Sequence, residues 1–360
     1  MAVTPLMEKL RRRIAAEGPM SLADFMQACL LDPDQGYYAT RDPFGAGGDF
    51  ITSPEISQMF GELIGLTLAQ SWMDQGSPQT FTLAEAGPGR GTLMADILRA
   101  TRSVPGFHDA MRIVLIEASP TLRSIQADKL AEFTPAWTDN FADLPKRPLW
   151  FVANEFFDAL PIRQFQRRGE GWSERMIALA DPGLAMALSQ PLPMPDLAHR
   201  LGDTVDGDIV EVCPAAEPIA ETIGARIAAH GGAALIVDYG GWHSLGDTFQ
   251  ALQAHEPVDP LAAPGEADLT AHVDFEPLAR AAAPAVAAPL VTQGVFLERI
   301  GITDRARALA KRLSGAPLDS HIAAHRRLTH PEEMGSLFKI LALTPPNAPA
   351  LPGTDTGESS

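Results

Sequence analysis

The most informative stretch of this chain reads Leu83-Ala84-Glu85-Ala86-Gly87-Pro88-Gly89-Arg90-Gly91-Thr92. An apolar strand, expected at 81–84, runs into a turn with three glycines, and the turn opens a helix expected at 92–100. Glycine has no Cβ, so the backbone at Gly87, Gly89 and Gly91 can pass close to a ligand. The helix that follows offers free N–H groups at its start. The pattern predicts a ligand-binding turn, and a tight turn without a ligand is the simpler alternative.

An acidic residue ends the next predicted strand. That strand is expected at 111–116 and is followed by Glu117. A carboxylate at this point can accept hydrogen bonds from both hydroxyls of a ribose. A surface acid at a strand end is the alternative, but the glycine turn upstream favours the ligand role.

Two cofactor classes compete for this turn. The dinucleotide fingerprint is G-x-G-x-x-G with an acid about 20 residues farther on. Here the third glycine comes one residue early and Glu117 lies farther along. Glu85 also precedes the first glycine, where its carboxylate would repel a pyrophosphate but attract the amino group and sulfonium of S-adenosylmethionine. The turn therefore favours S-adenosylmethionine, and an NAD(P)-binding oxidoreductase is kept as the alternative.

From Thr80 onward, short apolar strands alternate with helices. Continuous apolar strands between helices are typical of a parallel sheet covered on both faces. We therefore expect an α/β, Rossmann-like fold. The expected regions are an N-terminal helical cap and cofactor-covering segment at 1–79, a cofactor-binding core at 80–241 with an irregular insertion near 181–208, a substrate-cleft region at 242–343 and a disordered tail at 344–360.

Composition limits the classes of partner. The 360 residues include 28 basic and 45 acidic residues, giving a formal net charge of −17. This acidity argues against nucleic acid as the main partner, because phosphate binding needs clustered Lys and Arg. No apolar run approaches the roughly 20 residues that span a bilayer. Two cysteines, Cys29 and Cys213, are too few for a disulfide framework and indicate a reducing, cytosol-like compartment.

Several longer motifs resemble one methyltransferase family. The two longest are Gly48-Asp49-Phe50-Ile51-Thr52-Ser53-Pro54-Glu55-Ile56-Ser57-Gln58-Met59-Phe60-Gly61-Glu62 and Asn154-Glu155-Phe156-Phe157-Asp158-Ala159-Leu160-Pro161. They are similar to signatures of the mitochondrial complex I assembly methyltransferase and its bacterial relatives, the mitochondrial-dysfunction protein A family. Shorter matches lie at 18–21, 32–38, 237–240, 246–248, 269–275, 292–294 and 334–339. The resemblance runs from about Leu10 to Leu343, so we expect little room for a cleaved targeting sequence.

This resemblance implies a class I S-adenosylmethionine-dependent methyltransferase fold with S-adenosyl-L-methionine as cofactor and a protein substrate. In the mitochondrial members it implies symmetric dimethylation of an arginine in a core subunit of respiratory complex I, during assembly. A bacterial member would act in the cytoplasm on the matching quinone-oxidoreductase subunit or on another protein. A non-catalytic assembly factor that keeps the cofactor-binding fold is the alternative. The degree of methylation and the oligomeric state are left open.

The resemblance also assigns roles to residues around the cofactor. Glu85 is expected to orient the amino group of S-adenosylmethionine, and Glu117 to hold its ribose. The signature segment around Asp49 is expected to close over the cofactor, although a helix start with Ser53 as its N-cap explains the same residues. The expected cofactor-binding residues are Glu85, Gly87, Gly89, Gly91, Glu117, Asn154, Thr52 and Ser53.

The catalytic candidates follow strands of the predicted sheet, and ligands of such sheets bind where strands end. A guanidinium is a poor nucleophile while its charge is delocalised, and two carboxylates can grip it and polarise one nitrogen. We expect Glu155 and Asp158 to do this, and we count Asp238 as a third catalytic candidate. The alternatives are an internal salt bridge for Glu155 and a turn cap for Asp158.

Three further residues are expected to contact the substrate. They are Glu55, Tyr239 and His272. His272 could form an acid–base pair with Asp274, and a packed, hydrogen-bonded histidine is the alternative. His321 and His325 have the spacing of a zinc-binding helix but lack its glutamate and a third ligand, so no metal site is expected.

Overall fold

The computed structural model describes residues 4–40 and 51–355 of the 360. They form two compact units, each built from stretches that are separated in the sequence. Unit 1 comprises Met1–Phe50, Asp158–Ala216 and His243–Asp274, and unit 2 comprises Ile51–Phe157, Glu217–Trp242 and Phe275–Ser360. These units differ from the consecutive regions expected at 1–79, 80–241 and 242–343.

A mixed sheet forms the centre of unit 2. Its main strands are β2 (Phe81–Ala86), β3 (Met111–Ile116), β4 (Ala136–Thr138), β5 (Leu149–Asn154), β10 (Gly232–Gly241) and β17 (Phe338–Thr344). Along the sheet the order is β17-β10-β5-β2-β3-β4, with the short strands β15 (Val286–Ala287) and β16 (Val291–Thr292) pairing with β17. The pairs from β10 to β4 are parallel, whereas β17 is antiparallel to β10. Every residue of β2 and β5 is buried, which explains their continuous apolar character.

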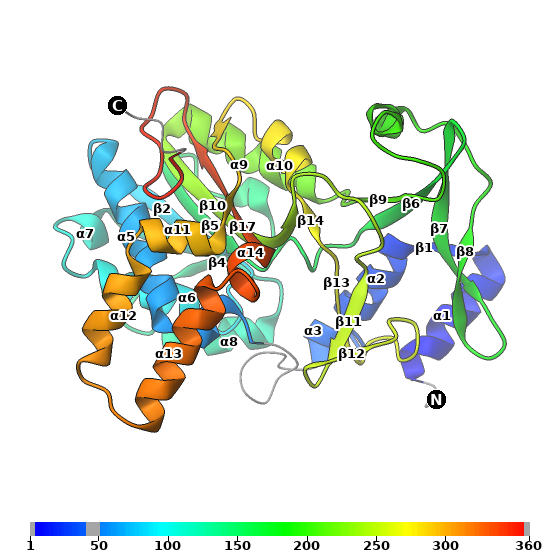
Figure 1. Ribbon diagram of the computed structural model, residues 1–360, viewed down its shortest axis with the longest axis horizontal. Coiled ribbons are helices and arrows are strands. Elements are labelled where there is room, and N and C mark those ends of the chain that lie inside the picture. The colour runs from blue at the N-terminus through cyan, green and yellow to red at the C-terminus, as the bar shows by residue number, and fades with distance from the viewer. Residues whose placement is uncertain (1–3, 41–50, 356–360) are drawn as a thin grey trace. The chain divides into compact units, whose positions relative to one another are not determined.

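Helices cover both faces of this sheet (Figure 1). The helices outside unit 1 are α4 (Ser53–Ile56), α5 (Gln58–Asp74), α6 (Thr92–Thr101), α7 (Phe107–Ala110), α8 (Pro120–Lys129), α9 (Ala216–His230), α10 (Phe275–Ala281), α11 (Gln293–Arg299), α12 (Ile302–Ala310), α13 (Ala316–Thr329) and α14 (Met334–Leu337), with a 3-10 turn at Phe141–Asp143. The α/β fold class and the parallel core expected from the sequence are confirmed.

One helix start differs from the expectation. The residue at the N-cap of α4 is Thr52 and not Ser53, and α4 ends after one turn at Ile56. Ser57 has extended backbone angles, and its hydroxyl accepts a hydrogen bond from the Met59 N–H at 3.2 Å. Ser57 therefore begins a separate helix, α5.

Unit 1 has helices packed with small antiparallel sheets. Its helices are α1 (Pro5–Glu17), α2 (Leu22–Leu31) and α3 (Tyr37–Thr40). One sheet has the order β1 (Met20–Ser21), β7 (Gly171–Leu179), β6 (Arg163–Arg168) and β9 (Ile209–Val212), with β8 (Leu184–Leu188) on β7. The second holds β12 (Glu256–Val258), β11 (Gln250–Gln253) and β13 (Asp268–Thr270), and β14 (Val273–Asp274) follows.

The core of unit 1 explains its discontinuous make-up. Leu6, Leu10 and Phe25 from the N-terminal helices are buried in one cluster with Ile177 of β7 and Leu269 of β13. None of these stretches can bury its apolar face alone. The region expected to be an irregular insertion at 181–208 contributes β8 and a 3-10 helix at Pro195–Leu201.

The C-terminal stretch is more ordered than the expected tail at 344–360. Thr344 is the last residue of β17, and Leu351 is fully buried in the core of unit 2. The Arg299 guanidinium donates a hydrogen bond to the Asp355 carbonyl at 2.8 Å. The expectation of disorder was therefore wrong for 344–355, because one apolar residue in a Pro-rich stretch is enough to anchor it. Residues 356–360 lie outside the described residues.

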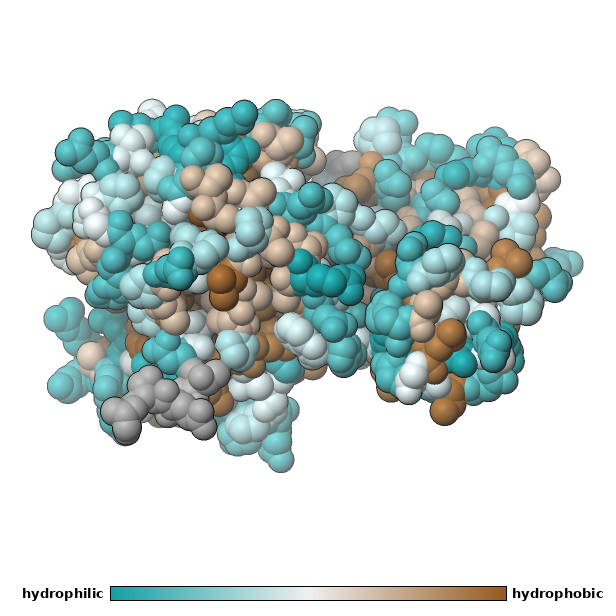
Figure 2. All heavy atoms as spheres, turned by 90° about the horizontal axis from the view of Figure 1, so that it is seen from above, coloured by the Kyte–Doolittle hydropathy of each residue, from teal (hydrophilic) through white to brown (hydrophobic). Residues whose placement is uncertain are grey.

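Hydrophilic and hydrophobic residues are interspersed on the face shown in Figure 2. Within 4–40 and 51–355, no helix combines the length and apolar character that crossing a membrane would require.

A buried carboxylate joins three helices of unit 2. Glu62 of α5 is only 3% exposed and accepts hydrogen bonds from Arg99 of α6 and from Arg305 of α12, the latter at 2.7 and 2.9 Å. Burial raises the pKa of Glu62, but the hydrogen bonds from the two arginines outweigh burial and lower it. The ionised carboxylate therefore holds α5, α6 and α12 together.

We expect Glu62→Ala to lower the free energy of unfolding by about 1 to 3 kcal/mol near neutral pH, because both guanidinium groups lose a buried partner. The folded-state pKa is lowered, so the contribution is present above the unfolded pKa and is lost as the pH falls through the folded pKa. Urea denaturation at pH 7 and at pH values below 4.5 measures both effects. Glu221→Gln, at an exposed position of α9, is the control. An equal deficit for Glu62→Ala at every pH would contradict the role of the ionised form.

Candidate active site

The register of the parallel strands brings four chain segments to one edge of the sheet. Ala86 of β2 pairs with Ile116 of β3 and with Ala153 of β5, and Val237 of β10 pairs with Asn154 of β5. β2, β3 and β5 therefore end together at this edge, and β10 continues to Gly241 beyond its last pair with β5. Ligands bind at this edge in sheets of this kind.

The glycine turn leaves β2 at this edge. Gly87, Gly89 and Gly91 all have positive φ angles, of 60°, 51° and 77°, which residues with a side chain rarely adopt. A Cβ on Gly87 would lie 2.9 Å from the Phe156 ring. Gly91 is the N-cap residue of α6 and provides no side-chain cap, so the start of this helix retains backbone donors.

Glu85 points from β2 toward the start of α6. Its side chain is 3% exposed and accepts a hydrogen bond from the Met94 backbone, while its Oε2 atom has no hydrogen-bond partner among the described residues. Burial raises the pKa of this carboxyl to about 8, and the Met94 hydrogen bond opposes that rise. A buried acceptor without a donor fits the amino group that the sequence assigned to Glu85.

Glu117 follows β3 and is held from several sides. Its Oε1 accepts the Ser119 N–H at 2.8 Å, and its Oε2 accepts the Gln126 side-chain amide at 3.2 Å. The Arg123 guanidinium donates to the Glu117 carbonyl at 2.7 Å. The carboxyl is 9% exposed, and burial raises its pKa against these hydrogen bonds. Glu117 is thus a preorganised acceptor at the strand end, as a ribose ligand requires. The sequence analysis missed Gln126, since a glutamine inside a helix carries no motif.

Asn154 and Glu155 extend from the end of β5. The Glu155 Oε1 atom accepts the Ser53 N–H and the Asn154 side-chain amide, both at 2.9 Å. Glu155 also has a positive φ of 51°, unusual for a residue with a side chain. The Asn154 Oδ1 atom is buried and lacks a hydrogen-bond partner among the described residues. The structure therefore brings the predicted residues Ser53, Asn154 and Glu155 into one hydrogen-bonded group.

Asp238 is fully buried after the core of β10. Its Oδ2 atom accepts the Phe157 N–H and its Oδ1 atom accepts the Tyr239 N–H, both at 3.0 Å. The Tyr239 ring packs edge-on against Phe338 at 5.4 Å between centroids. These contacts make Asp238 an anchor for the segment that carries Glu155, and the catalytic role expected for Asp238 stays a prediction.

Glu55 lies beside the start of α6. Its Oε1 atom accepts the Thr92 hydroxyl at 2.5 Å, and Lys129 of α8 donates to the same Thr92 oxygen at 2.6 Å. Thr52 makes no side-chain cap hydrogen bond at the start of α4. The signature segment is thus attached to the glycine-turn helix through Glu55. Asp49 lies outside the described residues.

Asp158 and His272 belong to unit 1. The Ala271 N–H donates to the Asp158 carbonyl at 3.0 Å, and the His272 N–H donates to the Thr248 hydroxyl at 2.8 Å. Asp158 also acts electrostatically on Tyr38, whose hydroxyl donates to Asp268 at 2.9 Å. The end of β13 therefore collects polar side chains from three separate stretches of unit 1.

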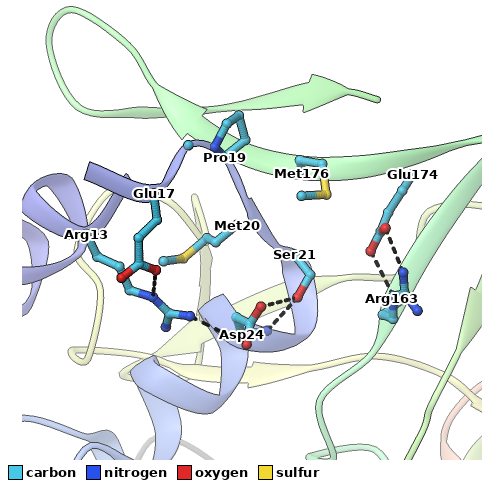
Figure 3. Close-up of a pocket in the computed structure, with 10 residues that line it drawn as sticks. Arg13, Glu17, Pro19, Met20, Ser21, Asp24, Arg163, Glu174 and Met176 are labelled. Atoms are coloured by element: carbon cyan, nitrogen blue, oxygen red, sulfur yellow. Dashed lines mark hydrogen bonds and ion pairs between the residues drawn. The ribbon is translucent and has the colours of Figure 1, made fainter. Parts of the chain in front are cut away.

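Unit 1 also contains a surface pocket of about 460 Å³ around the 18–21 motif. Figure 3 shows the Arg13–Glu17 pair on one side and the Arg163–Glu174 pair on the other. The Arg163 pair is bidentate, with distances of 2.8 and 2.7 Å. Because these charged side chains form ion pairs with one another, their charges do not indicate which class of ligand the pocket would bind.

The described residues contain no group of three His, Cys, Asp or Glu side chains that could hold a metal ion. His321 contacts the Ala306 carbonyl at 3.0 Å and His325 contacts the Thr303 hydroxyl at 3.0 Å, so each ring has its own partner.

Comparisons with known proteins identify the class of protein to which this chain belongs. Residues 63–291 match a family model described as "Putative S-adenosyl-L-methionine-dependent methyltransferase". The chain is 38% identical to "Protein arginine methyltransferase NDUFAF7, mitochondrial" of Homo sapiens, over 95% of this chain and 84% of that protein, and 37% identical to its Danio rerio counterpart, over 94% and 86%. A solved structure, described as a "likely methyl transferase from Burkholderia thailandensis bound to S-adenosyl-homocysteine", matches with a TM-score of 0.82 and 28% identity, over 98% of this chain and 94% of that one.

The fold and the site define an S-adenosylmethionine-dependent methyltransferase, and its cofactor is S-adenosyl-L-methionine. Within this class, the chain belongs to the NDUFAF7 family. These findings decide against the NAD(P)-dependent oxidoreductase that the glycine turn alone left open. The unpartnered Glu85 and Asn154 oxygens agree with the assignment, because a bound S-adenosyl-L-methionine offers amino and hydroxyl donors.

Glu85→Gln should stabilise the protein while weakening the cofactor site. The folded-state pKa of about 8 lies above the ordinary glutamate pKa of 4.5, so the folded protein retains a proton that the unfolded chain loses. Stability should therefore fall as the pH rises from about 5 to about 8, by at most ~1.4 kcal/mol per pH unit. The variant lacks this loss, so its advantage in urea denaturation should grow with pH.

In the same experiment, calorimetric titration with S-adenosylhomocysteine at about pH 9, where the Glu85 carboxyl is ionised, should show at least about tenfold weaker binding to Glu85→Gln, because a charged hydrogen bond is lost. Glu221→Gln again serves as the control. Parallel pH profiles for wild type and Glu85→Gln would show that this carboxyl does not titrate as the structure indicates.

Proposed function

We propose that this protein transfers the methyl group of S-adenosyl-L-methionine to an arginine of a protein substrate. The arginine specificity is supported by relatives named protein arginine methyltransferase that align with 94–95% of this chain. A net charge of −17 suits a cationic substrate, although charge alone identifies none.

One observation carries the proposal: a carboxylate is held in place beside the cofactor edge of the sheet. Glu155 directly follows β5, and two donors fix its Oε1 atom at 2.9 Å. The neighbouring strand β2 ends in the glycine turn, in register with β5. A carboxylate positioned before the substrate arrives needs little reorganisation to act on it.

Glu155 is suited to the chemistry of a guanidinium. When bound, S-adenosyl-L-methionine supplies a methyl group that is activated toward nucleophilic attack. The arginine nitrogen is a weak nucleophile while its positive charge is shared over the whole group, and its pKa lies above about 12. Glu155 accepts hydrogen bonds from the guanidinium, orients one nitrogen and favours departure of its proton as the new bond forms.

The other candidates take supporting roles in this proposal. Asp238 holds the Phe157 N–H and thereby the segment that carries Glu155. Asp158, three residues after Glu155 in the chain, is proposed as the second guanidinium carboxylate on the basis of the sequence resemblance. Tyr239, His272 and Glu55 are proposed as substrate contacts on the same basis.

We further propose that the substrate is a core subunit of respiratory complex I, or its bacterial equivalent, and that the product is symmetric dimethylarginine. The reaction would take place where that complex is assembled, in the mitochondrial matrix or in the bacterial cytoplasm. A non-catalytic assembly factor is the second candidate, since a bound cofactor could serve stability alone.

Glu155→Gln separates these two candidates. Glutamine keeps an oxygen that can accept the Ser53 and Asn154 hydrogen bonds but removes the charge. We expect the methylation rate to fall by about 10²- to 10⁴-fold, with the affinity for S-adenosylhomocysteine within about twofold of wild type. Transfer of labelled methyl to complex I subunits measures the rate, and Glu221→Gln is the control.

In cells, mass spectrometry should find one arginine whose methylation disappears on deletion and returns with the wild-type gene but not with Glu155→Gln. Full recovery of complex I assembly by Glu155→Gln, without recovery of methylation, would favour the non-catalytic role. Unchanged methylation in every complex I subunit would contradict the proposal that one of these subunits is the substrate.

A further inference from the structure

Gln126 connects the two cofactor-binding segments of unit 2. It lies in α8 and is fully buried. Its Nε2 atom donates to the Gly89 carbonyl at 2.8 Å and to the Glu117 Oε2 atom at 3.2 Å. Its Oε1 atom accepts the Trp137 indole N–H of β4 at 2.8 Å. One side-chain amide therefore joins the glycine turn, the end of β3 and the neighbouring strand β4.

The three hydrogen-bond partners of Gln126 allow its side-chain amide only one orientation. Trp137 can only donate, so it must face the amide oxygen, and the Gly89 carbonyl can only accept, so it must face the nitrogen. Both amide hydrogens are then used, one for Gly89 and one for Glu117. A flipped amide would place oxygen against two acceptors in a buried site, which is costly. Trp137 thus fixes the direction in which Gln126 donates.

The Glu117 carboxylate depends on this donor. An ionised carboxylate has about four acceptor positions. The backbone N–H groups of Ser119 and Ala118 and the side-chain amide of Gln126 donate to it. The acceptor capacity that is left can take a hydrogen bond from a ribose hydroxyl. The same donors favour the ionised form, against the burial that raises the pKa of Glu117.

We propose that Gln126, oriented by Trp137, is a positioning residue that holds the Glu117 carboxylate and the Gly89 backbone in the geometry that recognises the ribose of the cofactor. This inference rests on the role of Glu117 in the cofactor site and goes beyond the methyl transfer itself. It assigns part of the specificity for the nucleoside to a residue that acts through Glu117 and Gly89.

The test compares two ligands, S-adenosylhomocysteine and its 2′,3′-dideoxyribose analogue, by calorimetric titration of the full chain. Wild type should bind S-adenosylhomocysteine at least about tenfold more tightly than the analogue. Gln126→Glu has nearly the same shape but sets a carboxylate against Glu117 and the Gly89 carbonyl. It should weaken S-adenosylhomocysteine by about tenfold or more and the analogue by less than about threefold, so that discrimination between them collapses.

Gln70→Glu is a matched control. Gln70 is exposed on α5 and donates to the Asp74 carboxylate at 2.7 Å, so this variant also sets one carboxylate against another. Its affinities for both ligands should equal those of wild type. Equal weakening of both ligands by Gln126→Glu, or no weakening of either, would overturn the positioning role.

If Gln126→Glu does not fold, the variants Gln126→Met and Trp137→Phe test the same proposal. Methionine removes the donor without adding charge, and phenylalanine removes only the group that orients the amide. Both should reduce the discrimination between the two ligands, Trp137→Phe by about two- to fivefold, and full discrimination in both would overturn the proposal. If the wild-type protein binds the two ligands equally, Glu117 does not recognise the ribose and the proposal is wrong. The proposed methyl transfer is tested separately, by the Glu155→Gln variant.

Discussion

Everything at the candidate site depends on the register of four parallel strands. Because β2, β3 and β5 end together beside Val237 of β10, the glycine turn, Glu117, Glu155 and Asp238 lie at the same edge of the sheet. The pairing continues one residue beyond the strands, where the Gly87 N–H donates to Ile116 and the Glu155 N–H donates to Val237. A slip of one strand by one residue would turn each of its side chains to the opposite face and disrupt the site.

The site edge keeps two buried carboxyl and amide oxygens without hydrogen-bond partners among the described residues. Glu62 is also buried, but both of its oxygens have arginine partners. By contrast, Glu85 Oε2 and Asn154 Oδ1 lack hydrogen-bond partners among the described residues. Such atoms reduce the stability of the folded chain. Their position near the ends of β2 and β5 is expected where a ligand supplies the missing donors, since binding sites are often less stable than they could be.

Hydrogen bonds to two parts of the site explain what the signature segment after residue 50 does in the structure. Ser53 donates its backbone N–H to Glu155, and Glu55 accepts the hydroxyl of Thr92 at the start of α6. The segment is therefore connected both to the proposed catalytic carboxylate and to the glycine-turn helix. Asp238 acts in the same supporting way through the Phe157 N–H. Around Glu155, several residues that the sequence marks out serve to hold a carboxylate in place.

The sequence by itself determined the local elements of unit 2 and the class of cofactor. Apolar runs define the buried strands, three glycines define the turn, and Glu85 with Glu117 favours an adenosylmethionine site, because each signal depends only on neighbouring residues. Tertiary structure alone decided the two discontinuous units, the burial of Leu351 and the antiparallel strand β17, since these need contacts between distant stretches. It also decided the role of Gln126, whose three partners lie nine to 37 residues away and leave no local pattern. The spacing of apolar residues in the sequence indicates which residues are buried, but it does not indicate which buried side chains contact one another.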